Sequence, residues 1–430
     1  MLKRGIEKWD LVLLVINSII GAGIFGLPSK IFGLSGSWSL LAFFVCAIAV
    51  MMFIFCFAEV SSRFDKTGGP YLYAMEAFGG LPAFLTGWLL LLSRIFNYAT
   101  LINLIVIYIS FFSHFFQNEL GRMLCIFSIT AFLSFINYIG VKKSARLSNI
   151  FTVAKLVPLA IFIIAGLVTM QRELIDFSSL PASSSFSTSV LLLIFAFGGF
   201  ESVLINSGEI INPKKNLPFA LIISAIAVTI IYCLIQLVCI GNLPTLSTSQ
   251  KPLADAAVHS MGIQGGYLIA AGACISIFGT LNAIMLGGSR LPFAFSYENQ
   301  FPKLFSYIDP KHGTPLWSLL LFSVIVTFVS LAWSFLAALT IGAIIRVLVY
   351  STVCVSMVRL RKKQPGTDHF HVPHGYLLAT CALILSAWLL SASKITEIRD
   401  VAICAAIGLI IYGLQLLSNR RNRTRTHTIE

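Results

Sequence analysis

The residues with the clearest chemical potential are backbone amides at a point where an apolar stretch is interrupted. Three glycines and a proline fall between Asn17 and Pro28, inside the first apolar run of the chain. In hydrocarbon, non-helical backbone is tolerated only where it lines a cavity or is buried in protein. If one half-helix ends near Ile19 and a second begins near Ile24, the second presents free N–H groups and a positive N-terminus that suit a carboxylate. Close helix packing by small residues is the alternative explanation.

A second pair of glycines, Gly198 and Gly199, interrupts the sixth apolar run and is followed by Glu201. Insertion scales penalise a carboxylate at that depth, so Glu201 is a candidate functional residue. Each interruption opens a set of five apolar runs, and this layout predicts a 5+5 inverted repeat in which broken helices one and six meet at a binding site. Two interruptions in matching positions weaken the explanation by packing alone. The adjacent glycines also predict room for a sizeable ligand side chain.

Two basic residues, Lys155 and Arg346, lie deep within other apolar runs. A charge at such depth needs a partner or water. Burial disfavours the charged form of a lysine, so Lys155 could exchange a proton. Proton coupling through Lys155 is our hypothesis, and a fixed cation bonded to backbone carbonyls is the alternative. Arg346 could pair with Glu201 or with another group.

The composition indicates a polytopic membrane protein. Of the 430 residues, 57% are hydrophobic and only 11% are charged, and the mean hydropathy is +0.89. The run Ala74–Phe78 is too short to cross a membrane and is expected at the interface, as an inner gate or a plain connecting loop. Apolar runs of about 20 residues predict an all-α fold with twelve transmembrane helices, at residues 11–33, 38–61, 83–111, 121–139, 147–170, 188–208, 217–242, 265–288, 315–333, 335–358, 375–392 and 399–417.

The basic residues are distributed unevenly among the loops. The chain has 30 Lys and Arg against 17 Asp and Glu, a net charge of +13. Most of the basic residues fall in alternate loops and in the tail, which by the positive-inside rule places both termini in the cytoplasm of a multi-pass protein of the inner or plasma membrane. This distribution favours membrane lipids over nucleic acid as partners of the charge. No cleavable signal peptide is expected, because no small-residue cleavage site follows the first run.

Cysteine and histidine patterns point away from metal and disulfide chemistry. All nine cysteines fall inside apolar runs, so no disulfide framework is indicated. His369, His371 and His374 share one loop, but their spacing is poor for a metal site, and none is expected. No nucleophile, base or metal constellation lies at matched depth, so an enzyme is not expected.

Six motifs along the chain together carry a family resemblance. They are Gly21-Ala-Gly-Ile-Phe, Thr67-Gly-Gly-Pro-Tyr, Phe195-Ala-Phe-Gly-Gly-Phe-Glu, Gly208-Glu-Ile-Ile-Asn-Pro, Asn282 to Arg290, and Arg359-Leu-Arg-Lys-Lys-Gln-Pro. With them the chain resembles a permease of the amino acid–polyamine–organocation (APC) superfamily, which shares the fold of the sodium-coupled leucine transporters. The resemblance implies a transport core at 1–358, with repeats at about 10–170 and 188–358. Residues 359–430 would hold two peripheral helices and a basic tail.

The resemblance also implies a substrate site on both interruptions. The amides of residues 21–23 would hold a carboxylate, the carbonyls around Ile19, Phe195 and Ala196 an ammonium, and the rings of Phe195 and Phe197 the substrate side chain. Ala22 replaces a serine that is common in the family. Glu201 would couple protons or gate, and Lys155 matches a lysine that stands in place of a sodium ion. The residues assigned to substrate are Ile19, Gly21, Ala22, Gly23, Ile24, Phe195, Ala196, Phe197, Gly198 and Gly199, and those assigned to coupling or gating are Lys155, Glu201 and Arg346.

The function implied is transport of an amino acid, expected to be a neutral or apolar L-amino acid, coupled to protons and independent of sodium. The proton gradient would be the driving force, and no cofactor is expected. Exchange of amino acids or polyamines is the alternative, with a non-transporting sensor as a second. A cationic amino acid or polyamine is the alternative substrate, because Glu201 could pair with a second amine. The loop after span three has no cysteine, so a disulfide-linked partner chain is not expected.

Overall fold

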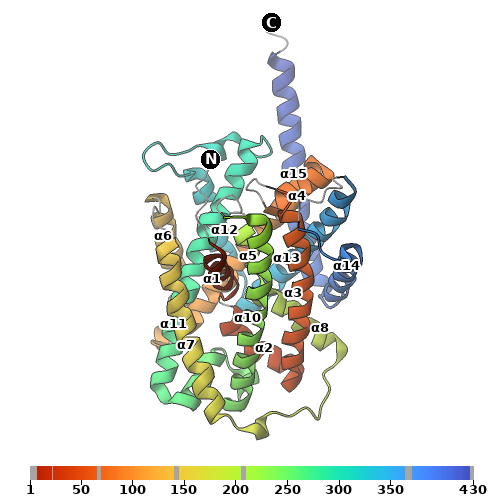
Figure 1. The fold of residues 1–430 in the computed structure, drawn as a ribbon. Helices are drawn as coiled ribbons and strands as arrows, with labels where there is room; N and C mark the ends of the chain where they lie inside the picture. The colour runs from red at the N-terminus through yellow and green to blue at the C-terminus, as the bar shows by residue number, and fades with distance from the viewer. Residues whose placement is uncertain are drawn as a thin grey trace.

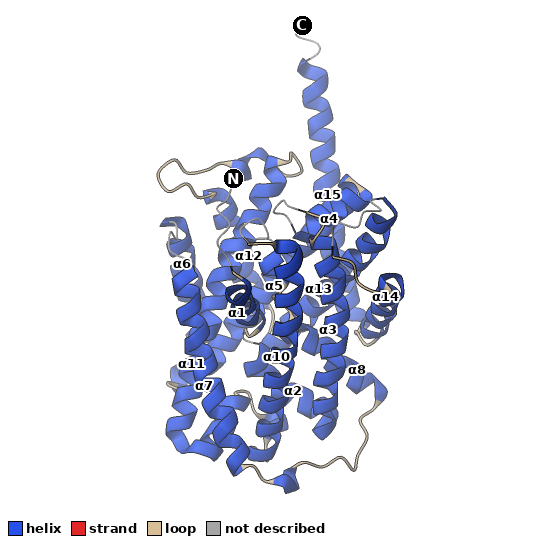
Figure 2. Cartoon of the chain, viewed as in Figure 1, coloured by secondary structure: helices blue, strands red, loops and turns tan. Residues whose placement is uncertain are grey.

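The computed structural model describes residues 7–21, 23–64, 69–139, 145–204, 210–363 and 370–426. These residues form helices joined by loops, and no strand occurs among them (Figure 2). The α-helices are α1 (Lys8–Ile19), α2 (Gly23–Ser35), α3 (Ser39–Ser61), α4 (Gly69–Phe78), α5 (Gly80–Ile109), α6 (Glu119–Ile139), α7 (Ala145–Thr169), α8 (Ser183–Phe197), α9 (Glu201–Leu204), α10 (Pro213–Asn242), α11 (Pro252–Tyr297), α12 (Leu316–Ala332), α13 (Phe335–Lys363), α14 (Gly375–Ser391) and α15 (Ile395–Thr426).

The apolar runs of the sequence become long helices. Within the described residues, seven helical segments are long and apolar enough to cross a membrane: Gly23–Ser61, Gly80–Ile109, Glu119–Ile139, Lys214–Asn242, Pro252–Tyr297, Phe335–Lys363 and Ile395–Leu417. Three further apolar helices are shorter, at Ser183–Phe197, Leu316–Ala332 and Gly375–Ser391, and α7 contributes the apolar stretch Lys155–Thr169. The chain is therefore an all-helical membrane protein, as its composition predicts.

Helices α5 and α13 form the centre of the bundle. In the most apolar stretch of each helix, 83% is buried inside the protein for α5 and 72% for α13, against 11% for Ile395–Leu417 in α15. Helix α5 packs on α13, α11 and α12, whereas α15 packs mainly on α13 and α5. Figure 1 shows α4 and the projecting part of α15 at one end of the bundle, with the connection between α7 and α8 at the other. The exposed apolar side chains of α15 suit contact with lipid.

Both predicted interruptions are present. The first helix ends at Ile19 and resumes at Gly23, and α8 ends at Phe197 before the short helix α9 begins at Glu201. Helix α2 packs on α8, and α1 contacts α9, so the two interruptions lie side by side. The short run ending at Phe78 is also helical, as α4, and it packs on α5 and α13.

A fully buried carboxylate ties together three segments at the end of the bundle that contains α4. Glu59, in the last turn of α3, is 0% exposed. It accepts hydrogen bonds from Arg361 Nε at 2.6 Å and from Arg361 Nη2, from Arg63 Nη2 at 3.2 Å and from the backbone N–H of Val372 at 2.9 Å. The Nδ1 atom of His371 lies 3.7 Å from Glu59 Oε1. These five residues, the Glu59 cluster, hold α3, α13 and the segment before α14 together.

Replacing Glu59 by alanine is expected to destabilise the protein strongly, because it leaves buried guanidinium groups without their carboxylate. Breaking a buried ion pair by removing one partner costs about 3–5 kcal/mol. The measurement is the thermal unfolding midpoint of the purified protein in detergent. Glu76→Ala is the matched control, because it removes a half-exposed ion pair with Lys363 on the same helix α13 and should cost at most about 1 kcal/mol. Equal shifts for the two variants would contradict a structural role of the Glu59 cluster.

Candidate functional site

The first interruption is shaped by close contact with the second. A Cβ atom placed on Gly23 would lie 2.7 Å from the Cα atom of Ala196, so only glycine lets α2 approach α8 this closely. The first N–H groups of α2, beginning at Gly23 and Ile24, have no acceptor within their own helix. Gly23 is one of the residues 21–23 whose amides the family resemblance assigns to a carboxylate. Ala22, the second of them, lies outside the described residues.

Gly21 lies in the first interruption, on the side that faces α11. Its N–H donates to the Ile19 carbonyl at 2.7 Å. A Cβ atom on Gly21 would lie 3.8 Å from the side chain of Thr280 on α11, which is ordinary van der Waals contact, so there is room for a small group here. One turn away on α11, the Oγ atom of Ser276 is buried and has no hydrogen-bond partner among the described residues. Sequence reasoning missed both hydroxyls, although a polar side chain in an apolar run was a usable signal.

The second interruption is not the open space that its glycines suggest. A Cβ atom on Gly198 would overlap the guanidinium group of Arg346. Gly199 has a φ of +121°, and a Cβ atom there would overlap the backbone oxygen of Ser18 in α1. The prediction that this pair leaves room for a ligand side chain is therefore wrong. The space beside one glycine holds a protein cation, and the space beside the other holds the backbone of the first helix.

Tyr232 on α10 joins the two interruptions. Its hydroxyl lies within hydrogen-bond distance of the carbonyl oxygens of Ile19, at 3.1 Å, and Ala196, at 3.0 Å. Its ring packs edge-on against Phe197, with centroids 5.1 Å apart. Tyr232 is fully buried, and nothing in the sequence distinguishes it from other aromatic residues of apolar runs. Among the described residues, the Ile19 carbonyl is within reach of two donors, Tyr232 and Gly21, and that of Ala196 is within reach of Tyr232. The single hydroxyl hydrogen of Tyr232 is shared between the two carbonyls.

Lys155 lies against the end of the first half-helix. Its Nζ atom donates to the carbonyls of Asn17 at 2.5 Å and Ile20 at 2.6 Å, and the residue is only 4% exposed. The last carbonyls of a helix have no intrahelical partner and carry partial negative charge, so an ammonium group is a suitable donor to them. These are the contacts named in the fixed-cation alternative, and they place Lys155 beside the first interruption.

Glu201 and Arg346 face each other across the second interruption. Arg346 Nη2 lies 3.8 Å from Glu201 Oε1, and Arg346 Nη1 donates to the Phe195 carbonyl at 3.0 Å. Glu201 Oε2 accepts from the Gly199 N–H at 2.8 Å and from the hydroxyl of Tyr350 at 3.0 Å. Arg346, whose partner the sequence leaves open, thus contacts both the Glu201 carboxylate and the Phe195 carbonyl. Tyr350 was missed from the sequence for the same reason as Tyr232.

The charges around this pair leave the site net positive. Arg94 on α5 also lies near enough to Glu201 to act on its charge, so two guanidinium groups surround one carboxylate. The positive end of α2 adds to this field. Lys155 stands apart, because its described hydrogen bonds go to α1 and none goes to Glu201 or Arg346. The last turn of α1 therefore lies between Lys155 on one side and the second interruption on the other.

Comparison with known proteins identifies the family. The model of the amino acid permease family matches residues 6–412. The serine/threonine exchanger SteT of Bacillus subtilis is 28% identical over 434 residues, covering 96% of this chain and 97% of the relative. The branched-chain amino acid permease BcaP of the same organism is 27% identical and covers 96% and 93%. The human large neutral amino acids transporter small subunit 2 is 29% identical over 390 residues, covering 85% and 71%.

The match to the family model spans almost the whole described chain, including both interruptions and the residues that contact them. Its members are permeases and not enzymes, in agreement with the expectation from the sequence. The chain belongs to the amino acid permease family of membrane transporters.

Proposed function

We propose that this permease carries neutral L-amino acids across the cell membrane, and that the substrate binds where the two interruptions meet. The observation that supports this most directly is the contact of Gly23 with Ala196, which brings the start of α2 against the end of α8. Around this contact, twelve membrane-crossing segments in a 5+5 inverted repeat would place the site at the bilayer midplane. Both termini would lie in the cytoplasm, in accord with the distribution of basic residues.

The N-terminus of α2 is the proposed carboxylate site. Its free N–H groups and positive dipole suit an anion. On the neighbouring Gly21, a Cβ atom would meet Thr280 at ordinary contact distance without overlap. The Ala196 carbonyl, which accepts a single hydrogen bond from the described residues, is the proposed acceptor for the substrate ammonium. The carbonyls of Ile19 and Phe195 each already have two donors in this conformation, so they would contribute only after rearrangement.

The charges support a substrate whose side chain carries no charge. Glu201 was the reason to consider a cationic amino acid or polyamine, but three protein groups already surround it: Arg346, Tyr350 and the Gly199 amide. A second ammonium would also meet the nearby guanidinium groups. The named substrates of the relatives include serine and threonine, branched-chain and large neutral amino acids, which are all uncharged in their side chains.

Uptake by proteoliposomes of a labelled amino-acid panel is expected to show preference for neutral amino acids. Unlabelled neutral competitors should reduce this uptake, while putrescine, lysine and arginine at the same concentration should not, because the guanidinium groups of Arg346 and Arg94 near Glu201 oppose a second cation. Competition by putrescine or lysine as strong as that by the neutral substrate would contradict the assignment. Saturable binding without any flux would instead identify a sensor.

Lys155 is the proposed coupling residue, with the proton gradient as driving force and no requirement for sodium. A proton leaving its ammonium group would weaken two charge-assisted hydrogen bonds to the end of α1, at Asn17 and Ile20. This links protonation to the position of the first half-helix. The alternatives are exchange of one amino acid for another, as the name of SteT indicates for that relative, and a Lys155 that is a permanent support.

Lys155→Ala is expected to abolish accumulation driven by a pH gradient while sparing exchange. The measurement compares uptake into vesicles with an imposed pH gradient, with and without sodium, and uptake into vesicles preloaded with unlabelled substrate. Lys303→Ala, which removes an exposed lysine far from the interruptions, is the control. Loss of both activities in Lys155→Ala protein that still folds would favour the fixed cation, and wild-type accumulation that requires sodium would contradict proton coupling.

Tyr232→Phe is expected to weaken apparent substrate affinity by about 5- to 30-fold, because the two interruptions lose the hydroxyl that joins the carbonyls of Ile19 and Ala196 and holds the proposed ammonium acceptor in position. The measurement is the concentration dependence of uptake. Tyr98→Phe is the matched control, since it removes a buried hydroxyl whose hydrogen bond among the described residues goes to Thr130 on α6. A similar change in both variants would indicate general destabilisation.

The relatives named as small subunits raise the question of a partner chain. We expect no disulfide-linked partner here, because the nine cysteines all lie in apolar runs and are free. A non-covalent partner is a separate question that copurification from the native membrane would address.

A further inference from the structure

The basic sequence at the end of α13 divides into two faces. Arg361 turns toward the Glu59 cluster, as described above. Arg359, Lys362 and Lys363 are spaced i, i+3 and i+4, which places them together on another face of the helix. One turn before them, Val355 and Val358 continue the same face as apolar residues. This face has no part in the proposed transport site.

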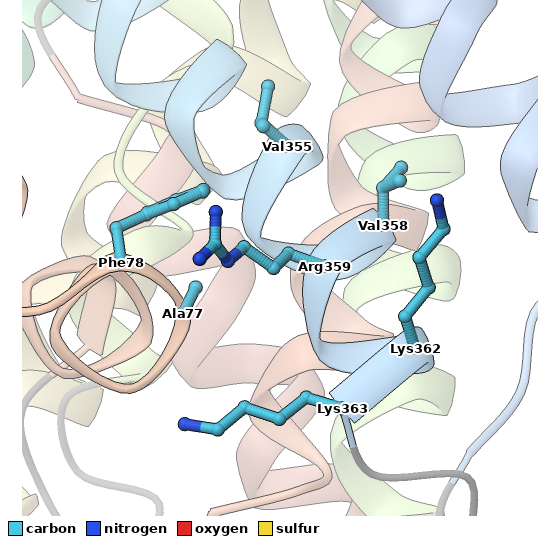
Figure 3. Close-up of a pocket in the computed structure, with 7 residues that line it drawn as sticks. All are labelled: Ala77, Phe78, Val355, Val358, Arg359, Lys362 and Lys363. Carbon is cyan, nitrogen blue, oxygen red and sulfur yellow. The ribbon is translucent and has the colours of Figure 1, made fainter.

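A pocket of about 580 Å³ lies between this face and helix α4. Figure 3 shows Arg359 and Lys363 reaching from α13 toward α4, where Phe78 and Ala77 form the opposite wall. Lys362 stands beside Val358 in the same view. The residues that line the pocket are Ala77, Phe78, Val355, Val358, Arg359, Lys362 and Lys363.

The pocket has an excess of positive charge. Lys363 is paired, since its Nζ atom lies 2.8 Å from Glu76 Oε1 and 2.9 Å from the Glu76 carbonyl oxygen. Arg359 lies over the ring of Phe78, with Cζ 5.3 Å from the centroid. No ion pair with a carboxylate is found for Arg359 or Lys362 among the residues that the structure describes. Two cations therefore face the pocket, and no carboxylate of the described residues forms an ion pair with either of them.

Below the cations the pocket is apolar. Val355 is 40% exposed, although most of the apolar part of α13 is buried inside the protein. It precedes Arg359 by four residues, about 6 Å along a helix. The end of a membrane-crossing helix lies at the headgroup level, and a valine one turn further in lies at the level of the acyl chains. Positive charge at one depth and an exposed apolar wall at the next match the two parts of a phospholipid.

We propose that this pocket binds an anionic phospholipid, with its phosphate at Arg359 and Lys362 and an acyl chain along Val355, Val358 and Phe78. A free phosphate ion would use the cations but would leave the apolar wall exposed. A lipid uses both and joins α4 to α13. The proposal concerns lipid binding alone and does not depend on which substrate the permease carries.

The first experiment measures lipid retention by native mass spectrometry. The purified full-length protein is mixed with phosphatidylglycerol or phosphatidylcholine in detergent, and bound lipid is counted. Wild type is expected to retain phosphatidylglycerol about 10- to 30-fold better than phosphatidylcholine. Arg359→Gln combined with Lys362→Gln should remove most of this preference. Lys303→Gln combined with Lys311→Gln, which removes two lysines from the loop between α11 and α12, should preserve it. Unchanged preference in the first variant would overturn the proposal.

The second experiment separates a lipid from a phosphate ion. The thermal unfolding midpoint is measured with added phosphatidylglycerol and with added sodium phosphate. Stabilisation by the lipid alone is expected, and Val355→Asn, which keeps both cations but makes the wall polar, should reduce it. Equal stabilisation of wild type by inorganic phosphate, or no effect of Val355→Asn on stabilisation by the lipid, would overturn the assignment to a phospholipid. Both measurements are independent of transport, so their failure and the failure of the proposed function can be told apart.

Discussion

The structure depends on one requirement, that backbone polar groups exposed by two broken helices find partners away from water. An unsatisfied carbonyl or amide in an apolar environment is costly, and each break exposes several. Lys155 supplies donors to Asn17 and Ile20, and Tyr232 supplies one hydroxyl to both interruptions. Arg346 donates a hydrogen bond to the Phe195 carbonyl, and Glu201 accepts one from the Gly199 amide. These four buried polar residues thus share one role: they are the hydrogen-bond partners of backbone groups that the interrupted helices leave unpaired.

Much of the architecture could be predicted because its signals are local. Apolar runs of membrane length specify helices, and glycines clustered inside such a run specify where a helix stops. The first half-helix ends at Ile19, where the sequence predicts it, and the second begins at Gly23, one residue before the expected Ile24. Lys155 and Arg346 were identifiable as candidates because a charge in an apolar run is costly wherever it points.

The partners of these residues could not be predicted, because they depend on which segments approach each other. Glycines show where side-chain volume is missing, but not what fills the space. At Gly198 the filler is Arg346, which comes from α13. Tyr232 and Tyr350 look like ordinary aromatic residues until the carbonyl or carboxylate beside each is known. The same holds for the basic run at the end of α13. Arg361 lies on the face of the helix that contacts Glu59, whereas Arg359 and Lys362 lie on the face that lines the pocket.

The Glu59 cluster has a mechanical consequence. Carrying a substrate across a membrane requires some segments to move relative to others, and packed elements tend to move as rigid bodies between discrete arrangements. Glu59 is held by donors from the turn after α3, from α13 and from the segment before α14, and its carboxylate is shielded from water. Separating these segments would strand a buried charge. Hinges are therefore expected elsewhere, at the interruptions beside Gly21 and Gly199, where the helical hydrogen-bond pattern stops. The ends of α3 and α13 would therefore move together as one rigid body.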